Sequence, residues 1–446
     1  MMGHRFMRRF MFAVLVAVAA ASTVIGQVPG TCSPPGTATC DPDGNPIDGP
    51  GAPDPVAPDP GAPGDGVPEA ITVHSLTSIV PLGGGLSVKG AEGIAIDPVT
   101  GLAYIGLNGT IVSGCVGDPS LTGVTAPADP EADRGAGRDR MSIVDPSASV
   151  EIAAVPTGEA PIWPTVDSSR GVVYMMGSGG TGTVTVHDPT DGRVLQVITV
   201  GGKPHMGGLD LSTGMMLVGN TVRSSEVIAE QNYASVIDTT TDTVALAFET
   251  SPAPHGVVVD QERDLIYFSA VGNGAIVVVS AVTGQPLFSA IPKDAYGADF
   301  GGNNMLARQA ATRRLFQVNT QLGYTGILVA DEVTLAAEQV ITLGNSAIPW
   351  GMAVDEPNRL LFAALPNTNA VAVVDLDTLT HVANIPVGTC PYAIAVDPAR
   401  RLAVVTNQGS PTEDATASIL SLCPIYAATG RAIAECSVLD QLRFSR

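Results

Sequence analysis

Two histidines stand in the same local setting, and imidazole is the side chain best suited to proton transfer near neutral pH. His205 lies in GGKPHMGGLD and His255 in SPAPHGVVVD, each directly after a proline and shortly before an aspartate. Glu92, in AEGIAID, occupies the same position of a third segment. A carboxylate with two imidazoles forms a candidate site for a divalent metal ion such as Zn, Mn or Fe. Without a metal, either histidine is a candidate general base.

The setting of these histidines recurs along the chain. Proline stands six residues before an aspartate that closes a short apolar run at Asp167, Asp210, Asp260, Asp355 and Asp397. A copy ending at Asp97 has alanine in the proline position, and NMLARQA, ending at Ala310, is interpreted as a degenerate copy. The sequence therefore contains seven copies of one unit.

The residues between the copies predict the fold. Each copy continues with a second, a third and a fourth run rich in Val and Ile, which is typical of strands. Aspartate at the end of a run favours a tight turn, because its carboxylate accepts backbone N–H groups. Four short strands repeated in this way predict an all-β, seven-bladed β-propeller over residues 71–422. Residues 73–83 are expected to supply the strand that closes the last blade, which covers an exposed sheet edge.

The repeats resemble a known family. PYAIAVDPARRLAVVTN and VVVDQERDLIYFSA are similar to the YVTN-type β-propeller repeats of exported and surface-associated bacterial and archaeal proteins. VVTN, residues 404–407, keeps the motif best, and Asn108 and Asn220 hold the position of its asparagine. The resemblance implies an architecture and no single activity, because related propellers serve as binding scaffolds, adhesins and enzymes.

Propeller geometry predicts where a ligand binds. The first strand of each blade lines the central channel, and the residue after the proline lies at one mouth. The residues at this position are Glu92, Ile162, His205, His255, Met305, Trp350 and Tyr392. The longest connections, 109–140, 220–232 and 289–304, lie on the same face, and long loops on a rigid scaffold are typical of binding. All of these mouth residues except Ile162 are predicted to contact a ligand.

Alternatives to simple binding remain open at this stage. A hydrolase or lyase centred on His205 or His255, with or without a metal ion, is the main one. Two loops rich in oxygen ligands are candidate cation sites or merely solvated loops, and their residues are Asp294, Asp299, Asn303 and Asn304 in one and Asp129, Glu131 and Asp133 in the other. The chain contains no G-x-S-x-G elbow, phosphate loop or dinucleotide fingerprint.

Charge limits the partners. Asp and Glu number 43 against 22 Lys and Arg, so the net charge of −21 argues against binding the phosphate backbone of a nucleic acid. We expect a monomer that binds a protein, a glycan or a small molecule.

The N-terminus and the cysteines predict export. Basic residues followed by the apolar run 10–26 predict a signal peptide over 1–26, with an uncleaved membrane anchor as the alternative. Residues 27–70, rich in Pro, Gly and Asp, are expected to form a disordered spacer. A secreted, periplasmic or cell-surface location favours disulfides. The six cysteines are Cys32, Cys40, Cys115, Cys390, Cys423 and Cys436. Their pairing stays open: Cys32 with Cys40 and Cys423 with Cys436 would close short local loops, and Cys115 with Cys390 would then tie distant segments. A cysteine pair is expected to tie the tail 423–446.

Overall fold

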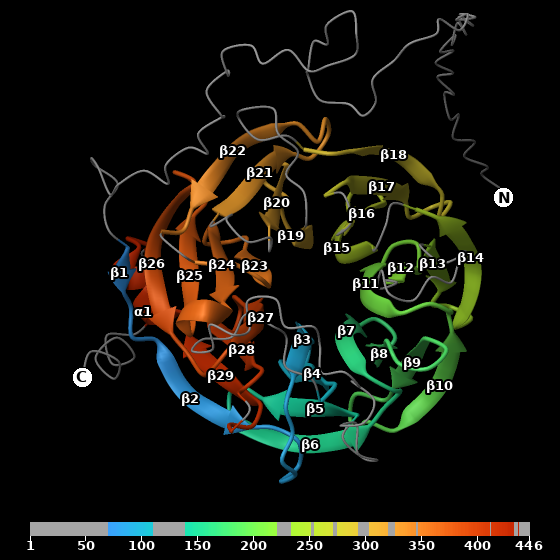
Figure 1. Ribbon diagram of the computed structural model, residues 1–446, viewed down its shortest axis with the longest axis horizontal. Coiled ribbons are helices and arrows are strands. Elements are labelled where there is room, and N and C mark those ends of the chain that lie inside the picture. The colour runs from blue at the N-terminus through green and yellow to red at the C-terminus, as the bar shows by residue number, and fades with distance from the viewer. Residues whose placement is uncertain are drawn as a thin grey trace, which may run out of the picture. The chain divides into compact units, whose positions relative to one another are not determined.

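Seven sheets stand around a common axis, six of four antiparallel strands and one of four antiparallel strands with a short parallel fifth, so the protein is a seven-bladed β-propeller (Figure 1). The computed structural model describes residues 70–109, 139–220, 233–250, 254–270, 274–292, 303–319, 326–344, 347–410, 412–431 and 436. The predicted signal peptide and almost all of the predicted spacer lie outside these residues. No helix in the described ranges is long and apolar enough to cross a membrane.

Blades 1 to 6 each use four consecutive strands from the channel outward, in the order that the repeat predicts. Blades 1 to 3 consist of β3 (Ala91–Ile96), β4 (Ala103–Leu107), β5 (Arg140–Asp145) and β6 (Val150–Pro156); β7 (Pro161–Asp167), β8 (Val172–Gly177), β9 (Thr183–His187) and β10 (Val194–Thr199); and β11 (Pro204–Asp210), β12 (Met215–Asn220), β13 (Tyr233–Asp238) and β14 (Thr243–Glu249).

The next three blades follow the same order. Blades 4 to 6 consist of β15 (Pro254–Asp260), β16 (Leu265–Ala270), β17 (Ile276–Ser280) and β18 (Pro286–Ala290); β19 (Asn303–Gln309), β20 (Arg314–Asn319), β21 (Gly326–Asp331) and β22 (Ala337–Thr342); and β23 (Met352–Asp355), β24 (Leu360–Leu365), β25 (Ala370–Asp375) and β26 (Thr380–Pro386). A short 3-10 helix, η2 (Pro366–Thr368), joins β24 to β25.

The N-terminal segment joins the two ends of the chain. Blade 7 takes three strands from the C-terminal end, β27 (Pro391–Asp397), β28 (Leu402–Asn407) and β29 (Thr416–Ser421), and its outer strand is β2 (Leu76–Pro81), antiparallel to β29. Just before it, β1 (Ile71–Thr72) pairs in parallel with the outer strand of blade 6. Arg400 of blade 7 also donates to the carbonyls of Pro98 and Val99 in blade 1. The segment before the first repeat therefore bridges blades 6 and 7.

The aspartates of the repeat form the corners of the blades, as predicted. Asp97, Asp167, Asp210, Asp260, Asp355 and Asp397 directly follow or end the first strand of their blade, and their Oδ1 atoms accept backbone N–H groups two or three residues on. We call the face with these short turns the turn face, and the opposite one, where the first strands begin, the loop face.

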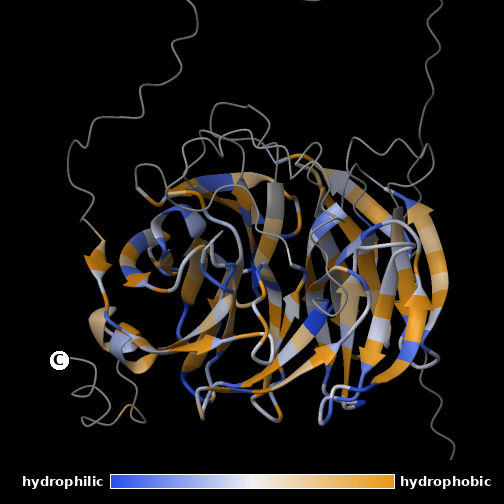
Figure 2. Ribbon diagram, turned by 60° about the horizontal axis from the view of Figure 1, so that its bottom comes forward, coloured by the Kyte–Doolittle hydropathy of each residue, from blue (hydrophilic) through white to orange (hydrophobic). Residues whose placement is uncertain are grey.

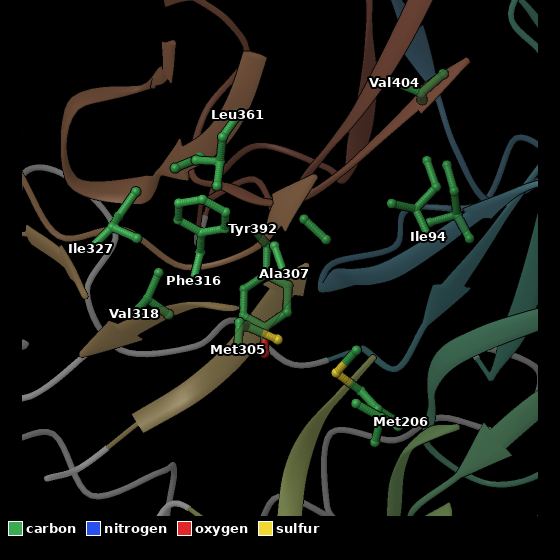
Figure 3. Close-up of a cluster of buried hydrophobic side chains, with 14 of the residues drawn as sticks. Ile94, Met206, Met305, Ala307, Phe316, Val318, Ile327, Leu361, Tyr392 and Val404 are labelled. Atoms are coloured by element: carbon green, nitrogen blue, oxygen red, sulfur yellow. The ribbon is translucent and has the colours of Figure 1, made fainter. Parts of the chain in front are cut away.

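Apolar side chains fill the spaces between the sheets. The largest buried cluster runs through all the blades except blade 2 and includes Met206, Met305, Phe316, Leu361 and Tyr392 (Figure 3). Neighbouring first strands contact one another all the way round the ring, from β3 through β7, β11, β15, β19, β23 and β27 back to β3. The first strands are thus held at fixed separations, which is what places the residues of the candidate site.

The C-terminal segment packs on blade 6. Helix α1 (Cys423–Ala428) buries Ile425 and Tyr426, and the Tyr426 hydroxyl donates to Oδ2 of the corner residue Asp355 at 2.5 Å. Cys423 and Cys436 form a disulfide, which confirms the predicted cysteine pair of the tail. Cys390 is disulfide-bonded as well, while Cys32, Cys40 and Cys115 lie outside the described residues.

Candidate functional site at the loop face

The first strands share a β-bulge at the position that follows the repeat proline. The register of the first strand against the second shifts there in β3, β7, β11, β15, β19 and β27. In blade 6 the strand begins only at Met352, two residues after Trp350. Because a bulge re-aims the side chains beside it, six of the blades redirect their side chains at the same level of the channel.

The bulges of blades 3 and 4 bring the two histidines together. The ring centroids of His205 and His255 are 3.5 Å apart, with 34° between the planes, and each residue is 8% exposed. Glycine at Gly208 allows this approach, because a Cβ atom there would lie 2.4 Å from Cγ1 of Val257 in the next blade. The repeat therefore creates an imidazole pair from residues that are distant in the sequence.

Blades 6 and 7 contribute a second ring pair. The rings of Trp350 and Tyr392 have centroids 4.8 Å apart at 48°, and Trp350 is only partly buried. The backbone of Gly351 donates to the Tyr392 carbonyl at 2.9 Å. A Cβ atom on Gly351 would come within 2.6 Å of the Ala393 backbone, so glycine is required for the two strands to meet. This pair offers an aromatic surface on the side of the ring away from the histidines.

Glu92 does not join the histidines. Its side chain is 4% exposed, and Oε1 accepts a hydrogen bond from Nδ2 of Asn108 at 2.5 Å. In the described part of the chain, no group of three or more His, Cys, Asp or Glu is placed to hold a metal ion. The candidate metal set of Glu92, His205 and His255 is therefore not assembled, because blade 2 separates Glu92 from the histidines.

The structure corrects the register of the fifth copy. Gln309, and not Ala310, pairs with the first residue of the second strand, which is the place of the repeat aspartate. The position that follows the proline is therefore held by Asn304, and Met305 is one residue further on. Met305 is 2% exposed and belongs to the buried apolar cluster, and its contact with a ligand stays a prediction.

Two predicted mouth residues have mainly structural surroundings. Ile162 is 7% exposed, and its carbonyl oxygen would be 2.7 Å from a Cβ atom on Gly106 of blade 1. Tyr392 is 3% exposed and belongs to the same buried cluster as Met305. Tyr392 therefore supports Trp350 more than it presents a surface of its own.

One contributor to this level of the channel was missed. Trp163, the residue after Ile162, packs directly on Gly93, where a Cβ atom would be 2.4 Å from the indole ring. The repeat pattern does not predict Trp163, because a β-bulge changes the direction of two consecutive side chains, whereas a regular strand alternates them. The sequence does contain a signal for this contact: Trp163 stands next to the repeat position, and the neighbouring copy has a glycine, Gly93, opposite it.

Two of the recurring asparagines of the repeat form hydrogen bonds within their own blades. Asn220 donates to Ser235 Oγ at 2.9 Å, and Asn407 donates to the hydroxyls of Thr416 and Ser418. Each thus ties the end of the second strand to the third strand of its blade.

The predicted cation loops gain no support. Asp129, Glu131, Asp133, Asp294 and Asp299 lie outside the described residues, and Asn303 and Asn304 belong to β19.

A network of salt bridges lies at the turn face, and the repeat pattern does not predict it. Arg308 of blade 5 contacts Glu332 at 2.7 Å and Asp260 of blade 4 at 3.0 Å, and both carboxylates are fully buried. Arg263 contacts the same two carboxylates. Burial, with the two acids acting in the same direction, raises the pKa of Tyr267 beside them. The network joins blades 4 and 5 at the place where blade 5 lacks its aspartate.

No protein-family model matches the chain. No curated protein matches it either. The class that the structure itself defines is a seven-bladed β-propeller, a fold that commonly serves as a scaffold for interactions.

Proposed function

We propose that this chain is an exported propeller of the YVTN type that binds a protein, glycan or small-molecule ligand at its loop face. The observation that carries the proposal is the paired arrangement at the channel mouth, with His205 against His255 and Trp350 against Tyr392. Imidazoles supply polar contacts and the indole ring supplies a flat apolar one, a combination suited to orienting a ligand.

The connections of the loop face support the same conclusion. Successive strands are joined there by the segments 108–139, 221–232 and 291–302, whereas the turn face has only short turns such as 211–214. Variable connections collected on one face of a rigid ring are typical of recognition sites. Export is supported by the Cys423–Cys436 disulfide together with the basic and apolar N-terminus.

A binding screen tests the proposal. The purified chain is screened against a glycan array and against a peptide library, and each hit is measured again with His205→Ala, His255→Ala and Trp350→Ala. The matched control is Val99→Ala in a turn of the opposite face, where Val99 is 69% exposed. We expect about tenfold or greater loss of affinity in the loop-face variants, as for residues central to an interface, and none in the control. Equal affinity in all four variants would remove the loop face as the binding site.

The catalytic alternative has its own readout. If the same histidine substitutions abolished turnover of a sugar or lactone while the ligand still bound, His205 or His255 would be a general base of a hydrolase or lyase. Binding without turnover in the unmodified chain supports the scaffold.

A further inference from the structure

The outer rim of the propeller consists of sheet edges that could pair with another chain. Each blade ends in an outer strand, and among the strands of the described residues only β1 extends such an edge, that of blade 6. All seven outer strands contain a bulge near their start, which twists the edge and hinders further pairing. Bulges alone therefore do not distinguish one blade from another.

Charged residues and proline are the other common protections of a sheet edge, and the outer strand of blade 2 has neither. Six outer strands contain a Glu or a Pro, and these residues are Pro81 in β2, Glu151 in β6, Glu249 in β14, Pro286 in β18, Glu338 in β22 and Pro386 in β26. Strand β10, with the sequence VLQVIT, has neither. Uncharged and apolar edges are the ones that pair with other chains.

The side chains of β10 are also unusually exposed for apolar residues. Val194 is 45% exposed, Leu195 47% and Val197 53%, so this strand carries more exposed large apolar residues than any other outer strand. Exposed apolar residues continue on the neighbouring outer strands, with Ile152 in β6 and Val244 in β14. Figure 2 shows hydrophobic stretches along the outside of the ring.

We propose that β10 is the surface through which two copies of this chain pair, edge to edge and antiparallel, about a two-fold axis at Val197. In this arrangement the turn with Asp188, Asp191 and Arg193 of one copy lies beside the loop with Lys203 of the other. The first group has a net charge of −1 and the second of +1, so the flanks are complementary. A two-fold pairing uses the same surface of both copies.

The net charge of the chain opposes association of two copies, so the strand through which they pair must add no further acid. Two chains of net charge −21 repel each other, and pairing through β6, β14 or β22 would add a buried glutamate to the contact. Strand β10 lets two copies meet without an acid in the strand pair. The monomer expected from the sequence is then the state at low protein concentration.

Salt should control this equilibrium. The strand pair is small beside a stable interface of about 1,200–2,000 Å², so the dimer is expected to be reversible. Between about 0.01 M and 1 M NaCl the Debye length falls from about 30 Å to about 3 Å, which removes most of the repulsion between the copies. The dimer is therefore expected to strengthen with salt.

Sedimentation equilibrium of the full purified chain tests the proposal over a series of protein and salt concentrations. We expect a monomer–dimer equilibrium whose Kd falls about tenfold or more across that salt range. Val197→Lys should weaken the dimer about tenfold or more, because it brings two like charges together at the axis. Leu195→Glu is the second variant, and thermal unfolding confirms that both are folded.

The control substitutes an equivalent residue on another blade. Val340 of β22 is 36% exposed on the outer strand of blade 5, and Val340→Lys should leave the Kd unchanged. A monomer at every protein and salt concentration would overturn the proposal. Dimers weakened equally by Val197→Lys and Val340→Lys would do the same, because the contact would then not be β10.

Discussion

The imidazole rings of His205 and His255 in adjacent blades have centroids 3.5 Å apart and are tilted by 34°, although each histidine belongs to a separate repeat. Neither strand alone forms the pair, because the contact exists only when the repeats stand side by side in the ring. The Trp350–Tyr392 pair arises in the same way between blades 6 and 7. The channel mouth thus has a polar side and an aromatic side, and both depend on the packing of neighbouring blades.

Removing a corner carboxylate should destabilise its blade. Asp210 is fully buried, and its Oδ1 accepts the backbone N–H groups of Ser212 and Thr213 at 2.9 and 3.0 Å. Asp210→Ala leaves these donors without their acceptor, so we expect a loss of about 2 kcal/mol in the free energy of unfolding. Asp210→Asn retains the Oδ1 acceptor and should lose less. Chemical denaturation measures both variants.

The control for this corner is an exposed aspartate in another turn. The Asp191 side chain is 54% exposed, and Asp191→Ala should change the free energy of unfolding by no more than about 0.5 kcal/mol. A similar loss in Asp191→Ala and Asp210→Ala would show that the buried corner has no special role.

Blades 2 and 3 are joined by a contact that should fail in acid. Arg170 pairs with Asp242 through two hydrogen bonds of 2.8 and 3.0 Å, and the Tyr174 hydroxyl donates to the same carboxylate at 2.7 Å. Burial alone would raise the pKa of Asp242, but these donors outweigh it, so the pKa of Asp242 is lowered in the folded protein. The carboxylate therefore stabilises the fold above about pH 4, its ordinary pKa, and this contribution is lost as the pH falls through the lowered value.

The measurement compares unfolding free energies over a pH series. Asp242→Asn should be less stable than the unmodified chain at neutral pH, and the difference should shrink below about pH 4. The Arg359–Asp377 pair is the control, since both of its side chains are about half exposed and Asp377→Asn should have little effect. A constant difference between the unmodified chain and Asp242→Asn down to low pH would contradict the assignment.

A buried histidine should add a second pH dependence. His187 is fully buried, with Nδ1 2.8 Å from the Gly192 carbonyl and Nε2 2.9 Å from Thr185 Oγ1. Burial lowers its pKa, and the carbonyl only partly opposes this. Below about pH 6.5 the unfolded chain takes up a proton that the folded chain does not, so stability should fall as the pH falls towards the lowered value.

His187→Gln should remove this slope. Free energies of unfolding at pH 5 to 7 are compared with those of His74→Gln, because His74 is exposed. The slope should persist in the His74 variant and be reduced in the His187 variant. An unchanged slope in His187→Gln would assign the pH dependence to other groups.

The sequence predicted most of the architecture because the repeat contains the physical reasons for it. Proline starts the first strand of most blades, and aspartate closes it by accepting the N–H groups of the turn. These features predict the corners of the blades. The candidate site followed less completely, because its position lies in a bulge. A regular strand alternates its side chains, and alternation did not reveal Trp163.

Where a copy of the repeat lacks its aspartate, the register predicted from the sequence is wrong by one residue. Gln309 replaces the aspartate of blade 5, and its Oε1 accepts the Thr312 hydroxyl at 2.6 Å, as an aspartate corner would. Without the aspartate, the repeat pattern places this copy one residue too far along the chain, and it assigns Met305 instead of Asn304 to the position that follows the proline. The neighbouring Arg308 forms salt bridges with Asp260 and Glu332, which lie on or next to other strands. The repeat pattern cannot predict such contacts, because they join different positions of different copies.

The C-terminal disulfide should stabilise the contact between α1 and blade 6. Cys423 and Cys436 are separated by 13 residues, and loops of about this length contribute roughly 3 kcal/mol by restricting the unfolded chain. The double variant Cys423→Ser/Cys436→Ser should unfold at a lower temperature. It also frees the segment that follows α1, which contacts blade 6 through Arg431 and Asp375 at 3.0 Å.

Tyr426→Phe separates the helix contact from the disulfide. It removes the hydroxyl that donates to Asp355, so the loss of stability should be about 1–3 kcal/mol, the value for a hydrogen bond to a charged group. Hydrogen exchange locates the effect, since the amides of β23 and β24 next to α1 should lose protection in both variants and those of blade 3 in neither. Because blade 3 lies away from α1, uniform loss of protection would mean that the tail stabilises the ring as a whole and not blade 6 alone.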